Sequence, residues 1–360
     1  MNSYSSNFRK IARHSLLLFA ICFLLFEWGC SRRFEPEPLS LTVKQNLALL
    51  QTDPQFVMYF NFKKMRDTGF WQKFISDSLF NSERNFGNFL NTLKDVTGIS
   101  ISNGIDELYF SNSWIGDNAM VVKGTFDKNR INEYVKTDTQ FVKIPYPNGI
   151  TVYNQTEAHF YFYFKDDFTV CGSNYVKQIE NTFEVKDTSQ AGLLTNADAM
   201  KTLERIKHKD NLWMMSGQKL FIRGIFENFS DLGKLDKNKQ PEAPQNDSIV
   251  TEDSTGEKQY DLLGLYDKIE AVSFSLMMTD DLDIVMQNEC ADNNSAIELK
   301  NKIDAVIALS KLSSQFTKKK DKTMLDILDK IDLTVHDKTM MIEVKLKDQQ
   351  VASIREKKIF

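Results

Sequence analysis

Apolar residues recur with two regular spacings along most of the chain after residue 38. A two-residue period predicts strands, and a three- or four-residue spacing predicts amphipathic helices. Through residue 183 these patterns predict a short helix over 39–50, a strand over 56–62, two helices within 63–96, a hairpin of 105–112 and 119–126, a helix over 127–135, a four-stranded meander between 141 and 171, and a helix over 174–183.

The second half repeats this order. Its patterns predict a strand over 212–215, a helix over 220–229, a hairpin of 269–278 and 282–288, a long helix over 295–312, a hairpin of 331–335 and 340–346, and a final helix. Ile105–Asn112 corresponds in this order to Ile269–Leu276, and Val121–Asp127 to Ile284–Cys290. We therefore expect an α+β fold of two tandem related units, each an antiparallel sheet covered by helices on one face.

Composition places the boundaries of these parts. Residues 1–29 are expected to be a lipoprotein signal peptide, 30–50 a tether with a short helix, 51–190 the first α+β unit and 191–360 the second. Within the second unit, residues 234–259 are rich in Pro, Asn, Asp, Glu and Lys. Such a segment cannot bury enough apolar surface to offset the entropy of ordering, so we expect a disordered insertion.

The first thirty residues have the three parts of an export signal. Arg9, Lys10 and Arg13 make the start basic, and Leu16–Phe26 is apolar throughout. As a helix, that apolar run reaches about 16 Å, roughly half of a bilayer core, so a transmembrane anchor is the weaker interpretation.

Gly29-Cys30 follows the apolar run, and a polar segment containing proline, Ser31–Pro38, comes next. This arrangement resembles the lipobox of bacterial lipoproteins, although Glu27 stands where that pattern has Leu or a similar aliphatic residue. The resemblance implies that Cys30 is lipidated with acyl chains such as palmitate and ties the chain to a membrane of the cell envelope. Ser31, rather than Asp, favours the outer over the inner membrane where the host has both. A cleaved ordinary signal peptide and an uncleaved anchor are the alternatives.

The mature part also resembles uncharacterised bacterial lipoproteins with a duplicated α+β domain. The resemblance rests on Val57–Phe60 after Asp53-Pro54, on Thr97–Ile99 before Ile105–Leu108, and on Val122–Asp127. That family has no established activity, so the resemblance implies none.

Charge and motifs exclude several classes of function. Residues 1–29 hold three of the 45 basic and one of the 49 acidic residues, so the mature chain carries 42 and 48, a net charge of −6. No basic run follows a phosphate backbone, and we expect no nucleic-acid partner. No nucleophile elbow, phosphate loop or metal-ligand spacing is present, so we predict no catalytic, cofactor-binding or metal residues. Cys171 and Cys290 end predicted strands and are expected to be buried free thiols.

One strand carries unusual aromatic content. In His159–Lys165, the Phe residues fall on one face, which is expected to pack under helices, and the Tyr residues fall on the other. The Tyr face is either ordinary sheet filler or the lining of a groove for an apolar or carbohydrate-like ligand.

Three functions follow from these observations. The leading prediction is a membrane-tethered, non-enzymatic envelope protein with a structural role or an envelope protein as its partner. The alternative is a carrier or sensor of an apolar ligand, held between sheet and helices and lined by the abundant Phe and Met. The third is a hydrolase in which His159 or His208 meets a carboxylate and a hydroxyl or thiol in one cleft.

Overall fold

The structure is a computed structural model that describes residues 36–75, 84–232, 263–316 and 322–356. These residues belong to one compact unit. The expected signal peptide, Cys30 and the expected insertion at 234–259 lie outside the described residues, as do parts of the predicted helices within 63–96.

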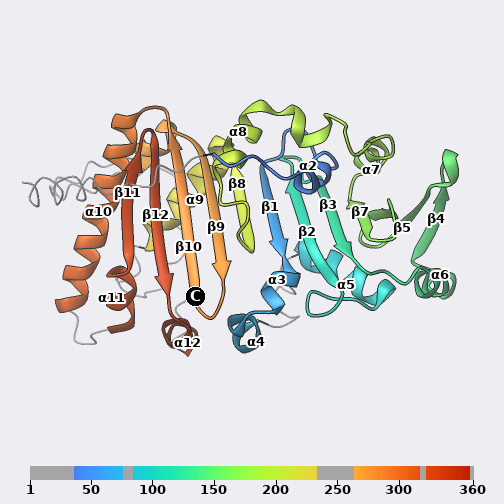
Figure 1. Cartoon of the computed structure of the whole chain (residues 1–360), viewed down its shortest axis with the longest axis horizontal. Coiled ribbons are helices and arrows are strands. Elements are labelled where there is room, and N and C mark those ends of the chain that lie inside the picture. The colour runs from blue at the N-terminus through green and yellow to red at the C-terminus, as the bar shows by residue number, and fades with distance from the viewer. Residues whose placement is uncertain (1–35, 76–83, 233–262, 317–321, 357–360) are drawn as a thin grey trace, which may run out of the picture. The chain divides into compact units, whose positions relative to one another are not determined.

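Twelve strands of the described chain form a single sheet, in which every pairing is antiparallel (Figure 1). Their order across the sheet is β11-β12-β10-β9-β8-β1-β2-β3-β7-β6-β5-β4. The strands are β1 (Phe56–Asn61), β2 (Ile105–Asn112), β3 (Asn118–Gly124), β4 (Phe141–Pro145), β5 (Thr151–Gln155), β6 (Phe160–Phe164), β7 (Thr169–Ser173), β8 (Leu212–Ser216), β9 (Ile269–Met278), β10 (Leu282–Cys290), β11 (Ile331–His336) and β12 (Thr339–Leu346).

Helices connect these strands. The α-helices are α2 (Leu41–Leu47), α3 (Phe62–Arg66), α4 (Gly69–Phe74), α5 (Arg84–Thr97), α6 (Lys128–Thr137), α7 (Val176–Thr182), α8 (Ala197–Arg205), α9 (Lys219–Leu232), α10 (Asn293–Phe316), α11 (Lys322–Leu328) and α12 (Asp348–Glu356). Short 3₁₀ helices are η2 (Pro147–Gly149), η3 (Gly192–Thr195) and η4 (Leu263–Lys268).

The mixed fold with antiparallel sheet is as predicted, but the expectation of one sheet per unit is wrong. β1 pairs with β8, from Val57 opposite Met215 to Phe60 opposite Leu212, and this pairing joins all the strands into one sheet. The physical reason is that each of these strands would otherwise be an edge with unpaired N–H and C=O groups. Across the junction, the rings of Tyr59 and Trp213 stack with centroids 5.3 Å apart.

The expectation that helices cover only one face is also wrong for the first half. On one face, Phe60, Leu108 and Met120 share a buried cluster with side chains of α4, α5 and α6. On the other face, Tyr59 and Trp213 share a second cluster with side chains of α2, α7 and α8. The first half of the sheet is thus a buried middle layer, which explains why six of the seven residues of β3 are buried.

Over the second half, α9 and α10 pack on one face of β9 to β12 (Figure 1). Ile222 of α9 and Leu299 of α10 join Val272 and Met340 of the sheet in a third buried cluster. The opposite face of these strands carries polar side chains, among them Ser273, Ser275, Gln287 and Glu343. This half therefore has an apolar face under α9 and α10 and a mixed opposite face, on which Val285 and Met341 are also buried.

Two local predictions about helices need correction. The helix predicted from residue 63 is divided into α3 and α4, because the Thr68 side chain accepts a hydrogen bond from the Trp71 N–H and starts a new helix. The stretch before β8 was not recognised as helical, yet it forms η3 and α8. The signal for α8 was present: Asn196 caps the helix, and Ala199 and Leu203 lie four residues apart on its buried face.

Replacing Trp213 by Ala is expected to lower the free energy of unfolding by about 3–5 kcal/mol, because the side chain is fully buried at the β1–β8 junction. Trp114 is 48% exposed and is the matched control, for which Ala should change the free energy by less than about 1 kcal/mol. Urea unfolding followed by circular dichroism measures both, and equal losses would contradict the importance of the junction.

Candidate functional site

Ten apolar side chains from five adjacent strands form two rows on the face of the sheet that α9 and α10 cover. Residues opposite one another in an antiparallel ladder point to the same face, so the register alone defines each row. We call these two rows the apolar rows; they are Met214, Phe274, Met286, Ile342 and Leu333, and Leu212, Leu276, Ile284, Val344 and Ile331.

The apolar rows are less buried than the same face on either side of them. All but Leu333 remain partly exposed. Beyond one row, Val272 and Met340 are 2% and 0% exposed, in the cluster with α9 and α10. Beyond the other row, Met278 and Leu282 are 5% and 8% exposed, in the cluster that Ile327 of α11 and Val351 of α12 also contact. The face is thus closed at both ends and incompletely covered between them.

Helix α10 shows the same change along its length. Ala296 and Leu299, near its start, are 0% and 1% exposed. Further along, Ile303 and Val306 pack against the third cluster but are only partly buried. Water-accessible apolar surface therefore persists on both the sheet and the helix, at a cost of roughly 25 cal/mol for each Å² that a fitted core would have buried.

A polar side chain lies at the buried inner end of this apolar face. Asn288 stands opposite Val272 on β9 and Met340 on β12, so its side chain points to the covered face with theirs. It is 0% exposed, and neither its amide nitrogen nor its amide oxygen has a hydrogen-bond partner. Buried polar side chains are nearly always hydrogen-bonded, so this unpaired amide requires an explanation.

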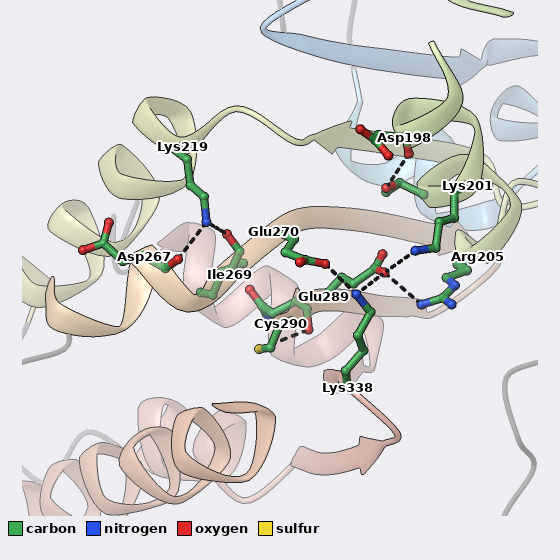
Figure 2. A network of polar contacts seen from close by, with 12 residues as sticks. Asp198, Lys201, Arg205, Lys219, Asp267, Ile269, Glu270, Glu289, Cys290 and Lys338 are labelled. Carbon is green, nitrogen blue, oxygen red and sulfur yellow. Dashed lines mark hydrogen bonds and ion pairs between the residues drawn. The ribbon is translucent and has the colours of Figure 1, made fainter. Parts of the chain in front are cut away.

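The next residue, Glu289, points to the opposite face and is held by three cations (Figure 2). Its side chain is 9% exposed, and its Oε1 lies 3.0 Å from Arg205 Nη1, 3.3 Å from Lys338 Nζ and 3.7 Å from Lys201 Nζ. Lys201 and Arg205 come from α8, and Lys338 from the turn between β11 and β12. We call these residues, with Glu270, the Glu289 network.

Three further hydrogen bonds, made by Lys338 and Lys219, strengthen the same region. Lys338 Nζ donates to Glu270 Oε2 at 2.5 Å, and this bond raises the pKa of Lys338 above its usual value. Lys219, at the start of α9, donates to the carbonyl oxygens of Asp267 and Ile269 at 2.8 and 2.6 Å (Figure 2). The end of β10 that carries Asn288 is therefore fixed to α8, to β9 and to the β11–β12 turn.

The sequence did not reveal this network. Lys201 and Arg205 lie in the helix that was not predicted, and Glu289 is one of many acidic residues along the chain. The usable signal was a charged residue inside a strand otherwise typical of a covered sheet, since a buried Glu nearly always has a partner.

The aromatic strand is partly as predicted. Phe160 and Phe162 are buried against the first cluster, which confirms the expected packing of the Phe face. The hypothesis of a ligand groove along the Tyr face is wrong, because Tyr163 is 3% exposed and its hydroxyl lies 2.9 Å from Thr182 Oγ1 of α7. The reason is that a helix covers this face too.

The two histidines considered for hydrolysis have different surroundings. His159 precedes β6 in an exposed turn with φ 48°, so it is not the first residue of the strand as predicted. His208 is 7% exposed, its Nδ1 has no hydrogen-bond partner, and burial lowers its pKa. In the described ranges no group of three or more His, Cys, Asp and Glu side chains is arranged to hold a metal ion.

Cys171 and Cys290 are both buried and unbridged, as predicted. Burial raises the pKa of Cys171 to about 12 and that of Cys290 to about 11. Because the thiolate is the reactive form, neither side chain is poised as a nucleophile near neutral pH.

Comparisons with known proteins give limited information. No family model matches the chain, and no curated protein matches it. Among solved structures, crystal forms III, IV and I of TP0453 are similar, with TM-scores of 0.46, 0.43 and 0.42 and sequence identities of 9%, 9% and 8%. Each match covers 86% of this chain, and 96%, 95% and 95% of the TP0453 chains respectively. Across the described segments, no helix has the length and apolar character required to cross a membrane.

Replacing Glu289 by Ala is expected to lower the free energy of unfolding by about 2–3 kcal/mol, because it leaves three cations without their shared partner. The value falls below the roughly 3–5 kcal/mol of a fully buried pair, since the cations reach water. Glu298, 42% exposed and paired with Lys268 and Lys302, is the control, for which Ala should leave the free energy of unfolding nearly unchanged because water and salt screen exposed ion pairs. Denaturant unfolding measures the free energy of unfolding of both variants. Equal losses would contradict a larger contribution of the Glu289 network than of an exposed ion pair.

Proposed function

We propose that this protein is a membrane-tethered component of the cell envelope that holds an apolar ligand between its sheet and helices α9 and α10. The observation that carries the proposal is the incomplete burial of the apolar rows, between two ends of the same face that are buried. The sequence predicts ligand binding as the alternative to a structural role. The partial exposure of the apolar rows supports ligand binding over a purely structural role.

The apolar rows have the character of a small-molecule site. Such sites are lined mainly by apolar and aromatic side chains and contain few polar groups. The two rows consist of Met, Phe, Ile, Leu and Val alone, and unbranched Met side chains adapt to ligands of varied shape. An ordinary core would have brought these side chains into full contact, as it does on both sides of them.

The tether supports the same proposal. A lipidated Cys30 would keep the protein beside a membrane, where apolar molecules are concentrated. The features behind this part are the basic start, the short apolar run and Gly29-Cys30. Outer-membrane placement is proposed on Ser31 alone. Binding, with no reaction and no cofactor, is the activity we assign.

A second candidate is binding to an envelope protein, and one observation favours it. Ile297, Leu309 and Leu312 of α10 are 42%, 48% and 51% exposed. At 100° per residue they fall within a sector of about 120° on the helix, so they could present one apolar surface to a partner.

We also propose that the two halves of the sheet derive from a duplicated unit. Outward from the β1–β8 pair, each side has a hairpin (β2–β3 or β9–β10) followed by a second hairpin in reverse order (β7–β6 or β12–β11). The first half departs from this correspondence by its additional β4 and β5. The matched order supports the kinship suggested by the repeated sequence pattern.

Ligand binding is tested with diphenylhexatriene, an uncharged probe that fluoresces in apolar surroundings. The wild-type protein should enhance its fluorescence saturably, and Met286→Gln should weaken binding about tenfold, because a buried amide without a partner opposes an apolar ligand. Leu309→Gln, on the exposed side of α10, is the control and should bind as the wild type does. No enhancement by wild-type protein, or equal weakening by both variants, contradicts the proposal.

The tether is tested by detergent partitioning and intact mass of the protein expressed in a bacterium. Wild type should enter the detergent phase with a mass that fits an acylated Cys30 at the N-terminus. Cys30→Ala should lack that mass and should stay in the aqueous phase if its leader is removed. Retention of residues 1–29 in both proteins would show an uncleaved anchor instead.

A further inference from the structure

The strongest unexplained feature of the described chain is the Asn288 side chain. Both its amide atoms are unpaired at 0% exposure, and the residues opposite it in the sheet are Val272 and Met340. An unpaired amide here opposes folding, and Leu would fill a similar volume without that cost. The Glu289 network ties the adjoining residue to α8 and to the β11–β12 turn, on the face opposite to Asn288.

Asn288 lies in line with the apolar rows. Side chains on one face of β10 recur every second residue, so Met286 and Ile284 follow Asn288 at about 7 and 13 Å, and Leu282 at about 20 Å. A ligand along this line would place one end against the amide and the rest against Met286 and Ile284. The site thus has one polar end and a long apolar wall.

The amide also defines the chemistry of the ligand's polar end. It offers donor hydrogens and an acceptor oxygen but no charge. A carboxylate or phosphate there would lose its hydration, and the described cations nearby already have partners: those of the Glu289 network bind Glu289 on the other face, and Lys219 of α9 donates to the carbonyl oxygens of Asp267 and Ile269. An uncharged head that both donates and accepts, such as a hydroxyl, matches Asn288.

We propose that Asn288 binds the hydroxyl head of a neutral single-chain amphiphile whose alkyl chain lies on the apolar rows. This inference rests on the proposed function and names the class of its ligand. The amide oxygen accepts the hydroxyl proton, and the amide nitrogen donates to the hydroxyl oxygen. Binding thereby satisfies Asn288 and covers the partly exposed rows in one step.

The test compares two ligands on two proteins. Dodecanol carries the hydroxyl head, and diphenylhexatriene carries no hydrogen-bonding group. Asn288→Leu keeps the volume and removes the amide, so it should weaken dodecanol binding about tenfold or more, measured by displacement of diphenylhexatriene. The same variant should bind diphenylhexatriene as well as the wild type does, or better.

Two controls separate this effect from general damage. Asn154→Leu alters another asparagine with an unpaired amide oxygen, on β5 in the other half of the sheet, and should leave dodecanol binding unchanged. Asn288→Val is a second apolar replacement and should reproduce the loss. Circular dichroism and thermal unfolding confirm that each variant is folded, and Asn288→Leu should unfold at a higher temperature than ligand-free wild type.

The outcomes distinguish the two proposals. If dodecanol displaces the probe equally well from wild type and Asn288→Leu, or not at all from wild type, the role of Asn288 is wrong while binding of an apolar ligand stands. If wild type does not bind the probe, the proposed function itself is wrong. Selective loss of dodecanol in both Asn288 variants, with Asn154→Leu unaffected, supports the inference.

Discussion

The two-residue period of β9, β10 and β12 is the constraint on which the rest of this structure depends. It sends every second side chain under α9 and α10 and the others to the opposite face. Neighbouring side chains of β10 therefore point to opposite faces. Asn288 lies on the apolar face without a hydrogen-bond partner, and Glu289 forms ion pairs with three cations on the other face. A shift of register by one residue would exchange the two faces and destroy both. The ion pairs of Glu289 form only in this register, so they favour the register that places the apolar rows.

Much of the fold could be predicted from the sequence, because periodicity reports which face of each element is covered. The strands and their hairpins follow the alternation closely, and Phe160 and Phe162 are buried as expected. The joining of the two halves could not be predicted, since the β1–β8 pair is a contact between backbones distant in sequence. The helix α8 was missed because its short pattern lies in a polar stretch, and with it Lys201 and Arg205. Coverage of the Tyr face of β6 depends on α7, which local pattern does not place.

The candidate site was even less visible. Met, Phe and Ile in alternating positions are typical of an ordinary core. The rows differ from such a core in their partial exposure, which becomes apparent by comparison with the buried Val272 and Met340 beside them. Asn288 reads as a strand end before the structure shows it buried with both amide atoms unpaired. The first half of the same sheet provides the internal standard, since its apolar face is packed against α4, α5 and α6. One sheet therefore carries an apolar face that is buried in its first half and only partly buried along the apolar rows of its second half.

The central claim is that the apolar rows receive a ligand. Labelling the methionine methyl groups with carbon-13 and recording their NMR signals during titration with diphenylhexatriene tests it most directly. Met214 and Met286 lie in the rows, whereas Met120, 2% exposed in the other half, and Met341, 4% exposed on the opposite face, serve as references. The account predicts saturable shifts of the Met214 and Met286 signals, with the Met120 and Met341 signals unchanged. Unchanged signals from Met214 and Met286, or equal shifts of all four, would contradict it.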